Sequence, residues 1–236
     1  MKRIALFCLV LFLAGCATAH DRKDPFEPVN RAIYKFNDSV DKAVMKPVAK
    51  GYEKVTPRFM QLMVSNFFSN LNDVVVTLND ILQLKGKQAF SDFGRVFINT
   101  TLGFAGLVDV AGASGYPKHD EDFGQTLGYW GVQAGPYLMI PFLGPSSFRD
   151  GIGSLTDAQF YPVYRTTDVA MRNSLIAANA VEKRADLLGS ESILQQAALD
   201  PYVFLREAYL QHRISLIYDG NPPLEDDDED YSPVQK

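Results

Sequence analysis

The segment PRFMQLMVSNFFSNLNDVVVTLNDILQLKG, residues 57–86, has no proline after its first position and no glycine before its last. Such an uninterrupted stretch predicts one helix of about 40 Å, at 1.5 Å per residue. Apolar side chains recur within one broad sector of that helix, from Met60 through Phe67 and Val74 to Leu82. The pattern is that of a long amphipathic helix at the centre of a mainly α-helical fold.

The opposite side of this helix is polar but nearly uncharged. Between Gln61 and Gln83 it carries serine, asparagine, threonine and glutamine, and its only charges are Asp73 and Asp80. A helix that faces water usually displays many lysines and glutamates. Two interpretations are therefore open: this side meets protein, lipid headgroups or a narrow aqueous channel, or neighbouring helices bury the long helix on most sides.

Helical patterns flank this segment on both sides. Apolar residues recur every three or four positions from Phe26, in a stripe interrupted at Pro47. Residues 88–112 predict shorter helices broken by glycines. Two further helices are predicted over 168–189, with Thr167 or Asp168 as N-cap, and from Asp200-Pro201 to Gly220. Without an internal repeat or strongly alternating segments, the fold class is mainly α.

The stretch from Gly112 to Gly153 has a different composition. It holds nine of the 17 glycines together with seven spaced Phe, Tyr and Trp residues, so it predicts neither a plain linker nor a regular element. Trp and Tyr rings settle at the headgroup depth of a bilayer with their polar ends in water. A membrane-interface belt and a packed irregular loop are both compatible with this composition.

The N-terminus predicts export and anchoring. An apolar run, IALFCLVLFLAG, follows Lys2 and Arg3 and is shorter than the ~20 residues of a spanning helix, so residues 1–15 are predicted to be a signal peptide. Leu13-Ala14-Gly15-Cys16 resembles the bacterial lipobox, which implies cleavage before Cys16 and acylation of that residue. The alternative is an ordinary signal peptide with an incidental cysteine. Ala17 follows the anchor position, and by the same resemblance this implies the outer membrane of a Gram-negative bacterium.

Composition narrows the range of functions. Cleavage removes Lys2 and Arg3 from the 23 basic residues, leaving 21 against 28 acidic ones, a net charge of −7 that makes nucleic acid an improbable partner. The mature body has no thiol besides Cys16, so its stability must come from packing. The predicted layout is a lipidated tether over 16–25, one domain over 26–220 and an acidic disordered tail over 221–236.

Motifs for catalysis do not stand out. The sequence has no G-x-S-x-G elbow, P-loop or dinucleotide fingerprint. His119-Asp120-Glu121-Asp122 lacks the ligand spacing of zinc and the regular oxygen pattern of a calcium loop, so a polar loop is the simpler interpretation. We therefore expect no enzyme activity, no cofactor and no metal.

Several long strings resemble the MlaA (VacJ) lipoproteins, in order and after the lipobox. They are DPFEPVNRAIYKFND (24–38), SNFFSNLND (65–73), FGRVFINTTLGFAGLVDVA (93–111), DFGQTLGYWGVQAGPYLMIPFLGPSSFRD (122–150) and DPYVFLREAYLQHR (200–213). The resemblance implies a ring-like body of amphipathic helices in the plane of the outer membrane, on its periplasmic side. It also implies that the protein removes phospholipids from the outer leaflet through an amphipathic channel. The implied partners are membrane phospholipids, a trimeric porin and a soluble periplasmic phospholipid carrier.

This role would account for the uncharged polar helix side. Neutral amides and hydroxyls can hydrogen-bond a lipid headgroup in a channel while apolar helix faces remain toward the acyl chains. Asn66, Asn70 and Asp73 are the candidates for the channel wall on the long helix. The resemblance assigns a channel or gating segment to Phe123, Gly124, Leu127, Gly128, Tyr129, Trp130, Gly131, Gly135, Pro136 and Tyr137. Its glycines would act either as hinges or as sites of close packing.

Two alternative functions remain. A porin-associated structural lipoprotein would share the anchor and the aromatic belt but would need no channel. A phospholipid hydrolase would share the membrane location but requires a nucleophile with a base in reach.

Overall fold

The computed structural model of the protein describes residues 23–189 and 199–223. The predicted signal peptide, Cys16, most of the tether and residues 224–236 of the predicted tail lie outside the described residues. The described parts are mainly helical, as the sequence predicts.

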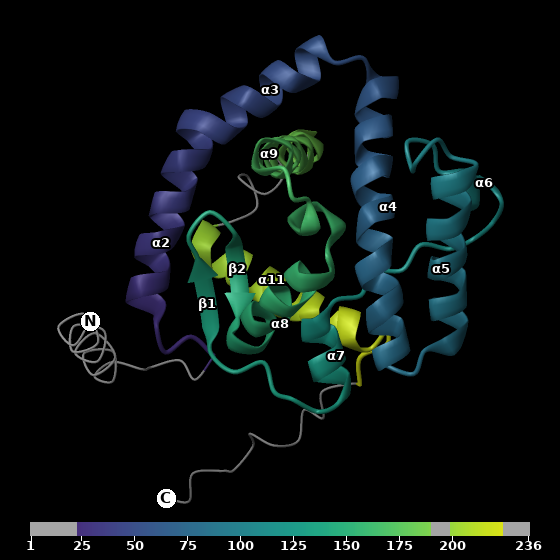
Figure 1. The fold of residues 1–236 in the computed structure, drawn as a ribbon. Helices are drawn as coiled ribbons and strands as arrows, with labels where there is room; N and C mark the ends of the chain where they lie inside the picture. Colours follow the sequence, from purple (N-terminus) through teal and green to yellow (C-terminus); the bar gives the residue numbers. More distant parts are fainter. Residues whose placement is uncertain (1–22, 190–198, 224–236) are drawn as a thin grey trace, which may run out of the picture.

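The first helical unit is one long bent rod. Helix α2 (Glu27–Val40) continues through a π-helical turn, η2 (Asp41–Met45), into α3 (Lys46–Val55). Pro47 lies in the first turn of α3, directly after this π-helical turn, and the helical stripe continues through it. In Figure 1 this rod arches over the molecule and meets the upper end of the next helix.

The predicted long helix is present as α4 (Arg58–Leu82), and it packs along α5 (Gly86–Thr101). Helix α5 runs through Gly94 without the expected break, and the short α6 (Val110–Ala113) follows. Figure 1 shows α4 and α5 side by side, with α5 and α6 on the outer side of α4.

The glycine- and aromatic-rich stretch is more regular than its composition predicts. It holds α7 (Phe123–Tyr129), an antiparallel hairpin of β1 (Tyr137–Ile140) and β2 (Gly144–Ser147), and the start of α8 (Phe148–Phe160). Asp122 and Ser147 cap α7 and α8 with their side chains, which accept hydrogen bonds from the backbone N–H groups of Gln125 and Asp150. Local capping therefore creates helices where glycine content predicts a loop.

Two asparagines of α2 cover the open edge of β1. Asn30 accepts from the N–H of Met139 at 2.9 Å and donates to the carbonyl of Tyr137 at 3.0 Å. Two turns later, Asn37 accepts from the N–H of Phe142 at 2.8 Å and donates to the carbonyl of Ile140 at 3.0 Å. The α2 rod thus satisfies strand groups that an edge strand would otherwise leave exposed.

The remaining helices close the body. The 3₁₀ turn η3 (Pro162–Arg165) leads to α9 (Val169–Asp186), and α11 (Pro201–Ile217) is the last described helix. The N-caps of α9 and α11 are Asp168 and Asp200, as predicted. Figure 1 shows α9 end-on between the α2–α3 arch and α4, and α9 contacts both α3 and α4.

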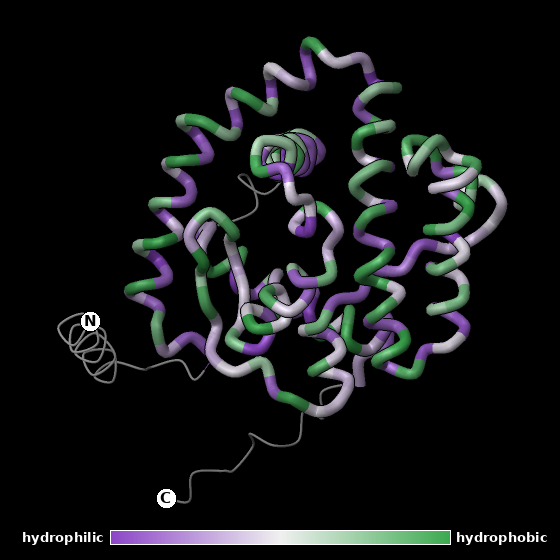
Figure 2. Tube along the Cα trace, viewed as in Figure 1, coloured by the Kyte–Doolittle hydropathy of each residue, from purple (hydrophilic) through white to green (hydrophobic). Residues whose placement is uncertain are grey.

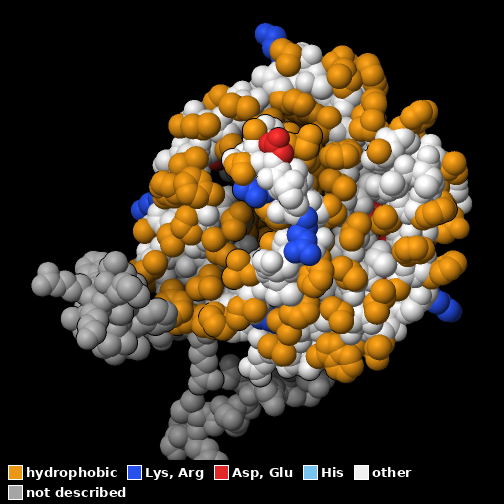
Figure 3. All heavy atoms as spheres, viewed as in Figure 1, with side chains coloured by type: hydrophobic (Ala, Val, Ile, Leu, Met, Phe, Trp, Pro, Cys, Tyr) orange, Lys and Arg blue, Asp and Glu red, His pale blue; other side chains and the backbone are white. Residues whose placement is uncertain are grey.

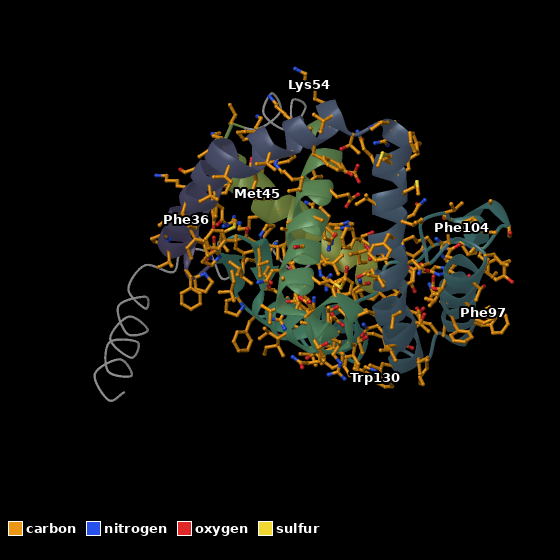
Figure 4. All side chains as sticks on the ribbon, turned by 45° about the horizontal axis from the view of Figure 1, so that its top comes forward. Phe36, Met45, Lys54, Phe97, Phe104 and Trp130 are labelled. Atoms are coloured by element: carbon orange, nitrogen blue, oxygen red, sulfur yellow. The ribbon has the colours of Figure 1, made fainter. Side chains whose placement is uncertain are left out.

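Apolar side chains face outward over much of this body. Phe90 and Phe104 are 74% and 78% exposed, and Figure 4 shows Phe97 and Phe104 pointing away from α5 and the loop that follows it. Figure 3 shows hydrophobic side chains spread over the visible face, and Figure 2 shows the alternation of polar and apolar residues along the helices. Of the helices described, none combines the length and the apolar character needed to cross a membrane.

Polar side chains occupy the interior instead. Asp73, Asp80 and Asp92 are fully buried between α4 and α5, where a water-soluble helix pair would place leucine or valine. The apolar core is small by comparison and centres on Tyr137, Met139 and Tyr202. The molecule thus has an apolar exterior and a polar interior over α4 and α5.

Candidate functional site

A cavity of ≈ 700 Å³ lies on the side of α4 that faces α8, η3 and α9. Loop residues 118 and 120–122 and the hairpin residue Leu143 complete its wall. Its volume is in the range of small-molecule pockets, about 300–1,000 Å³. Phe68, Val75 and Leu155 give it an apolar portion beside hydroxyl, amide and charged side chains.

Helix α4 contributes one of its two polar stripes to this cavity. Ser65, Ser69 and Asn72, spaced by four and three residues, line the wall. The predicted residues Asn66, Asn70 and Asp73 have the same spacing but lie one residue, or ~100°, further around the helix. They face α5 and the loop after it.

Hydrogen bonds hold this second stripe against its neighbours. Asn66 donates to the carbonyl of Leu107 at 3.2 Å, and Asn70 donates to the hydroxyl of Thr100 at 3.0 Å. Asp73 accepts from Nε of Arg95 at 3.3 Å and also from Lys118. In the structure these three residues therefore join α4 to α5 and its following loop, and they do not line the ≈ 700 Å³ cavity.

Arg95 is the centre of the network between α4, α5 and α6. Its guanidinium also donates to both carboxylate oxygens of Asp109 at 3.1 Å and to the carbonyl of Tyr116 at 3.0 Å. Burial raises the pKa of Asp109, but hydrogen bonds from Gly112, Asn99 and Arg95 outweigh it and lower that pKa overall. A buried arginine with this many acceptors is fully used in holding helices together.

A second buried pair, Asp80 and Asp92, lies further along the α4–α5 contact. Burial and the neighbouring carboxyl of Asp92 raise the pKa of Asp80 to about 8. His119 lies 2.6 Å from Asp92, from Nδ1 to Oδ2.

The residues of the His119–Asp122 string, considered above for metal binding, make separate contacts: His119 with Asp92, Glu121 with Lys85 and Asp122 with Arg213. Within residues 23–189 and 199–223, no group of three or more metal-ligating side chains is arranged to hold a metal ion.

The acidic loop of the cavity wall is tied to the C-terminal end of α4 and to the residues that follow α11. Glu121 is nearly fully buried and accepts from Gln83 at 2.7 Å and from Lys85 at 2.6 Å. Lys85 also bonds to Asp219 at 2.6 Å. Burial raises the pKa of Glu121, although Lys85 and Gln83 offset part of the effect.

Asp122 caps α7 and pairs with Arg213 of α11. Burial raises the pKa of Asp122, but hydrogen bonds and attraction from Arg213 outweigh it and lower the pKa overall. Arg213 also donates to Asp150 at 3.0 Å. The pair fixes α7 and α11 at the cavity margin.

The predicted channel or gating residues lie outside this cavity. Phe123, Gly124, Leu127, Gly128 and Tyr129 belong to α7, and its C-terminal neighbour Trp130 donates from Nε1 to the carbonyl of Leu82 at 3.0 Å. Gly131 and Gly135 have φ of +85° and +69°, which favours glycine at both positions. Pro136 precedes β1, and Tyr137, the first residue of that strand, is fully buried in the core.

Close packing explains one of the predicted glycines directly. A Cβ on Gly124 would lie 2.5 Å from Oδ1 of Asp150 and 2.8 Å from a terminal nitrogen of Arg213. Of the two roles considered for these glycines, close packing therefore has structural support at Gly124. A hinge role for the glycines of this segment stays a prediction.

Helix α9 supplies wall residues that the sequence analysis did not select. Asn179, Glu182, Lys183 and Asp186 all line the cavity, whereas the sequence of α9 has the appearance of an ordinary solvated helix. The only local signal is the i, i+4 spacing of Glu182 and Asp186, which places both carboxylates on one side of the helix. Glu182 is 5% exposed, and burial raises its pKa.

The fold and the cavity together define a class of protein: a helical body with an apolar outer surface, a polar interior and a cavity suited to an amphipathic molecule. Comparison with known proteins agrees with this description. Residues 22–215 match the family model described as MlaA lipoprotein. The chain belongs to the MlaA lipoprotein family.

Relatives and a solved structure support the assignment. The intermembrane phospholipid transport system lipoprotein MlaA of Escherichia coli (strain K12) is 39% identical over 220 residues, covering 89% of this chain and 86% of the relative. The protein of the same name from Haemophilus influenzae is 34% identical over 218 residues, covering 88% and 87%. A solved structure concerned with the "structural basis for maintenance of bacterial outer membrane lipid asymmetry" superposes with a TM-score of 0.73 at 34% identity, covering 85% of this chain and 100% of that one. The names of these two relatives describe a transport role.

Proposed function

We propose that this protein removes mislocalised phospholipids from the outer leaflet of the outer membrane through an amphipathic channel. It hands them to a soluble periplasmic carrier and so maintains lipid asymmetry. The observation that carries this proposal is the polarity of the fold: apolar side chains face outward around a cavity whose wall combines apolar side chains with hydroxyl, amide and charged ones. A lipid headgroup needs polar partners on its path through hydrocarbon, because an unsolvated polar group there is costly.

The same polarity and the sequence of the N-terminus support a membrane location. Exposed phenylalanines of α5 suit a hydrocarbon environment, and the acyl chains predicted on Cys16 provide a durable anchor when two or more are present. We place the ring-like body in the periplasmic leaflet, in association with a trimeric porin. This location brings the cavity to the depth at which headgroups lie.

The proposed transport step needs no bond to be made or broken. Ser65, Ser69 and Asn72 of α4 offer neutral hydrogen-bonding groups on one wall, and Asn179 offers another on α9. Phe68, Val75 and Leu155 provide an apolar surface for the first methylenes of the acyl chains. Neutral groups hold a headgroup less tightly than an arginine fork would, which favours passage over retention.

The test measures phospholipid accessible to an impermeant amine-reactive label on intact cells of a deletion strain. Restored wild type is expected to lower surface phospholipid, whereas Cys16→Ala is not. Ser69→Trp places a bulky side chain in the cavity and is expected to leave surface phospholipid high, whereas Met60→Trp changes an exposed residue on the opposite side of the same helix and is expected to restore the strain. Thermal unfolding by circular dichroism confirms that both tryptophan variants fold.

Two outcomes contradict the proposal. If deletion leaves surface phospholipid unchanged, the protein acts as a structural lipoprotein at the porin. If Ser69→Trp folds and restores the strain as well as Met60→Trp does, lipid does not pass through this cavity. Lysophospholipid formed by the purified protein would instead indicate a hydrolase.

A further inference from the structure

The charges on the cavity wall are unequal. Six carboxylates line it, against the two lysines Lys118 and Lys183; the acids are Asp120, Glu121, Asp122, Asp157, Glu182 and Asp186. An anionic molecule would meet an excess of like charge in such a space. The lysines nevertheless give the wall both signs of charge, as a zwitterion requires.

Several of these charges are already neutralised by the protein. Asp122 is paired with Arg213, Glu121 with Lys85, and Lys118 with Asp73. Asp157 accepts hydrogen bonds from the side chain of Asn79 at 3.0 Å and from the N–H of Phe123 at 2.9 Å. These groups hold elements together and are not available to a ligand without loss of those contacts.

Asp120, Glu182 and Asp186 remain, and of these three carboxylates only Glu182 is buried. Glu182 is 5% exposed, and its carboxyl has side-chain hydrogen bonds with Ser65 and with the carboxyl of Asp186. Within residues 23–189 and 199–223, no lysine or arginine forms an ion pair with either carboxylate. Burial raises the pKa of Glu182, and the like charge of Asp186 raises it further. A buried carboxyl beside another carboxyl is stabilised by a proton or by a cation.

The surroundings of this pair suit an ammonium group. Asn179 precedes Glu182 by three residues on α9, lines the same cavity, and its buried Oδ1 accepts no hydrogen bond from the described residues. Its amide nitrogen lies 3.4 Å from the hydroxyl of Tyr161, which orients the side chain. An ammonium carries three N–H donors, matching two carboxylates and one amide oxygen. Lys183, adjacent in sequence, provides a positive charge on the same wall.

We infer that this cavity selects zwitterionic aminophospholipids, with the ammonium of a phosphoethanolamine headgroup at Glu182 and Asp186 and its phosphate toward Lys183. The inference rests on the proposed function, since it assumes that lipid enters the cavity. Phosphatidylglycerol carries the same phosphate but no cation, so it leaves the carboxylate pair without a partner. With identical acyl chains, the two lipids differ in the headgroup alone: ethanolamine carries an ammonium, whereas glycerol carries two uncharged hydroxyls.

The test uses the purified full-length protein in detergent. It is incubated with mixed micelles of equimolar phosphatidylethanolamine and phosphatidylglycerol with identical acyl chains, repurified, and its bound lipid is quantified by mass spectrometry. Wild type is expected to hold phosphatidylethanolamine over phosphatidylglycerol by about tenfold, the effect of one charge-assisted hydrogen-bonding group. Glu182→Gln together with Asp186→Asn is expected to bring the ratio close to one, with the total lipid per protein unchanged.

A matched control and a second variant separate the possible outcomes. Glu53→Gln changes an exposed carboxylate on α3, outside the cavity, and is expected to keep the wild-type ratio. If the double variant unfolds, Glu182→Gln alone preserves side-chain shape and is expected to reduce the ratio at least threefold. If the wild-type protein binds lipid but holds phosphatidylethanolamine and phosphatidylglycerol in a ratio near one, the inference is overturned and the transport proposal stays intact. Wild type that binds neither lipid contradicts the transport proposal itself.

Discussion

Arg213 of α11 donates hydrogen bonds to both carboxylate oxygens of Asp122, at 2.5 and 2.9 Å. The same guanidinium reaches Asp150 at 3.0 Å, so one side chain joins α7, α8 and α11. Arginine suits this position because its planar fork matches a carboxylate with two parallel N–H groups. The margin of the cavity depends on this cluster.

Replacing Arg213 is expected to destabilise the fold. Arg213→Met leaves Asp122 without its cation, and Asp150 keeps only Arg149, so we expect a loss of at least about 2 kcal/mol. Thermal unfolding in detergent, followed by circular dichroism, measures the loss. Arg58→Met, at an exposed arginine of α4, is the control and is expected to change stability by less than about 0.5 kcal/mol. Equal effects of the two substitutions would refute a structural role for the cluster.

The same cluster predicts a loss of stability in acid. The pKa values of Asp122 and Asp150 are both lowered overall in the folded protein, so the folded state favours their charged forms. Their contribution is therefore present above the ordinary value of 3.8 and is lost as the pH falls through the lowered folded pKa. We expect the unfolding temperature of wild type to drop below about pH 4, with a smaller drop for Arg213→Met. Parallel curves for the two proteins between pH 5 and pH 2 would count against this account.

The raised pKa of Asp80 predicts that, at higher pH, stability falls as the pH rises. Its pKa is raised from 3.8 to about 8, so between these values the folded state holds a proton that the unfolded chain releases. Stability attributable to Asp80 falls as the pH rises from about 4 to 8, by at most about 1.4 kcal/mol per pH unit, and then levels off. Asp80→Asn removes the titration and is expected to flatten the profile of unfolding temperature between pH 5 and 9. The exposed Glu53→Gln is the control, and a slope that persists in Asp80→Asn would show that another group causes it.

Two glycines of α8 offer a matched test of helix packing. A Cβ on Gly153 would lie 2.4 Å from the backbone nitrogen of Gly124 in α7, so Gly153→Ala must push the two helices apart. We expect a loss of about 1–3 kcal/mol, measured by thermal unfolding. Gly151 lies in the same helix with its nearest atom at 3.8 Å, so Gly151→Ala is expected to be neutral or to stabilise by about 0.5–1 kcal/mol. A Gly153→Ala protein as stable as Gly151→Ala would contradict the close crossing of α7 and α8.

The outward phenylalanines of α5 are expected to govern membrane binding and not folding. Phe90, Phe93 and Phe97 are 74%, 59% and 61% exposed, so replacing them with serine removes little packing within the protein. In a Cys16→Ala background, each replacement is expected to weaken binding to phospholipid vesicles by about tenfold or more, measured by flotation. Thr101→Ser, at an exposed polar position of the same helix, is the control. Undiminished vesicle binding would place this face of α5 outside the hydrocarbon.

Local signals in the sequence were sufficient to predict most of the long helices. Prolines, glycines and capping residues act within a few positions of a helix end, so α4, α9 and α11 could be predicted with their N-terminal boundaries. The same reasoning failed between residues 112 and 153, where glycine content predicts an irregular segment. There Asp122 and Ser147 cap helices, and the hairpin depends on asparagines of α2 about 100 residues earlier in the chain. Contacts at such separation leave no local pattern.

The sequence by itself determined that α4 has a long apolar face and a polar side that is nearly uncharged. Only the tertiary structure decided that Ser65, Ser69 and Asn72 line the cavity, whereas Asn66, Asn70 and Asp73 bind α5 and the loop after it. The two stripes differ by ~100° around one helix, which periodicity cannot distinguish. The role of α9 was decided in the same way, because Glu182 becomes a buried wall residue only when α9 packs between α3 and α4. Periodicity identifies the faces of a helix, but what each face meets depends on the neighbours that folding brings to it.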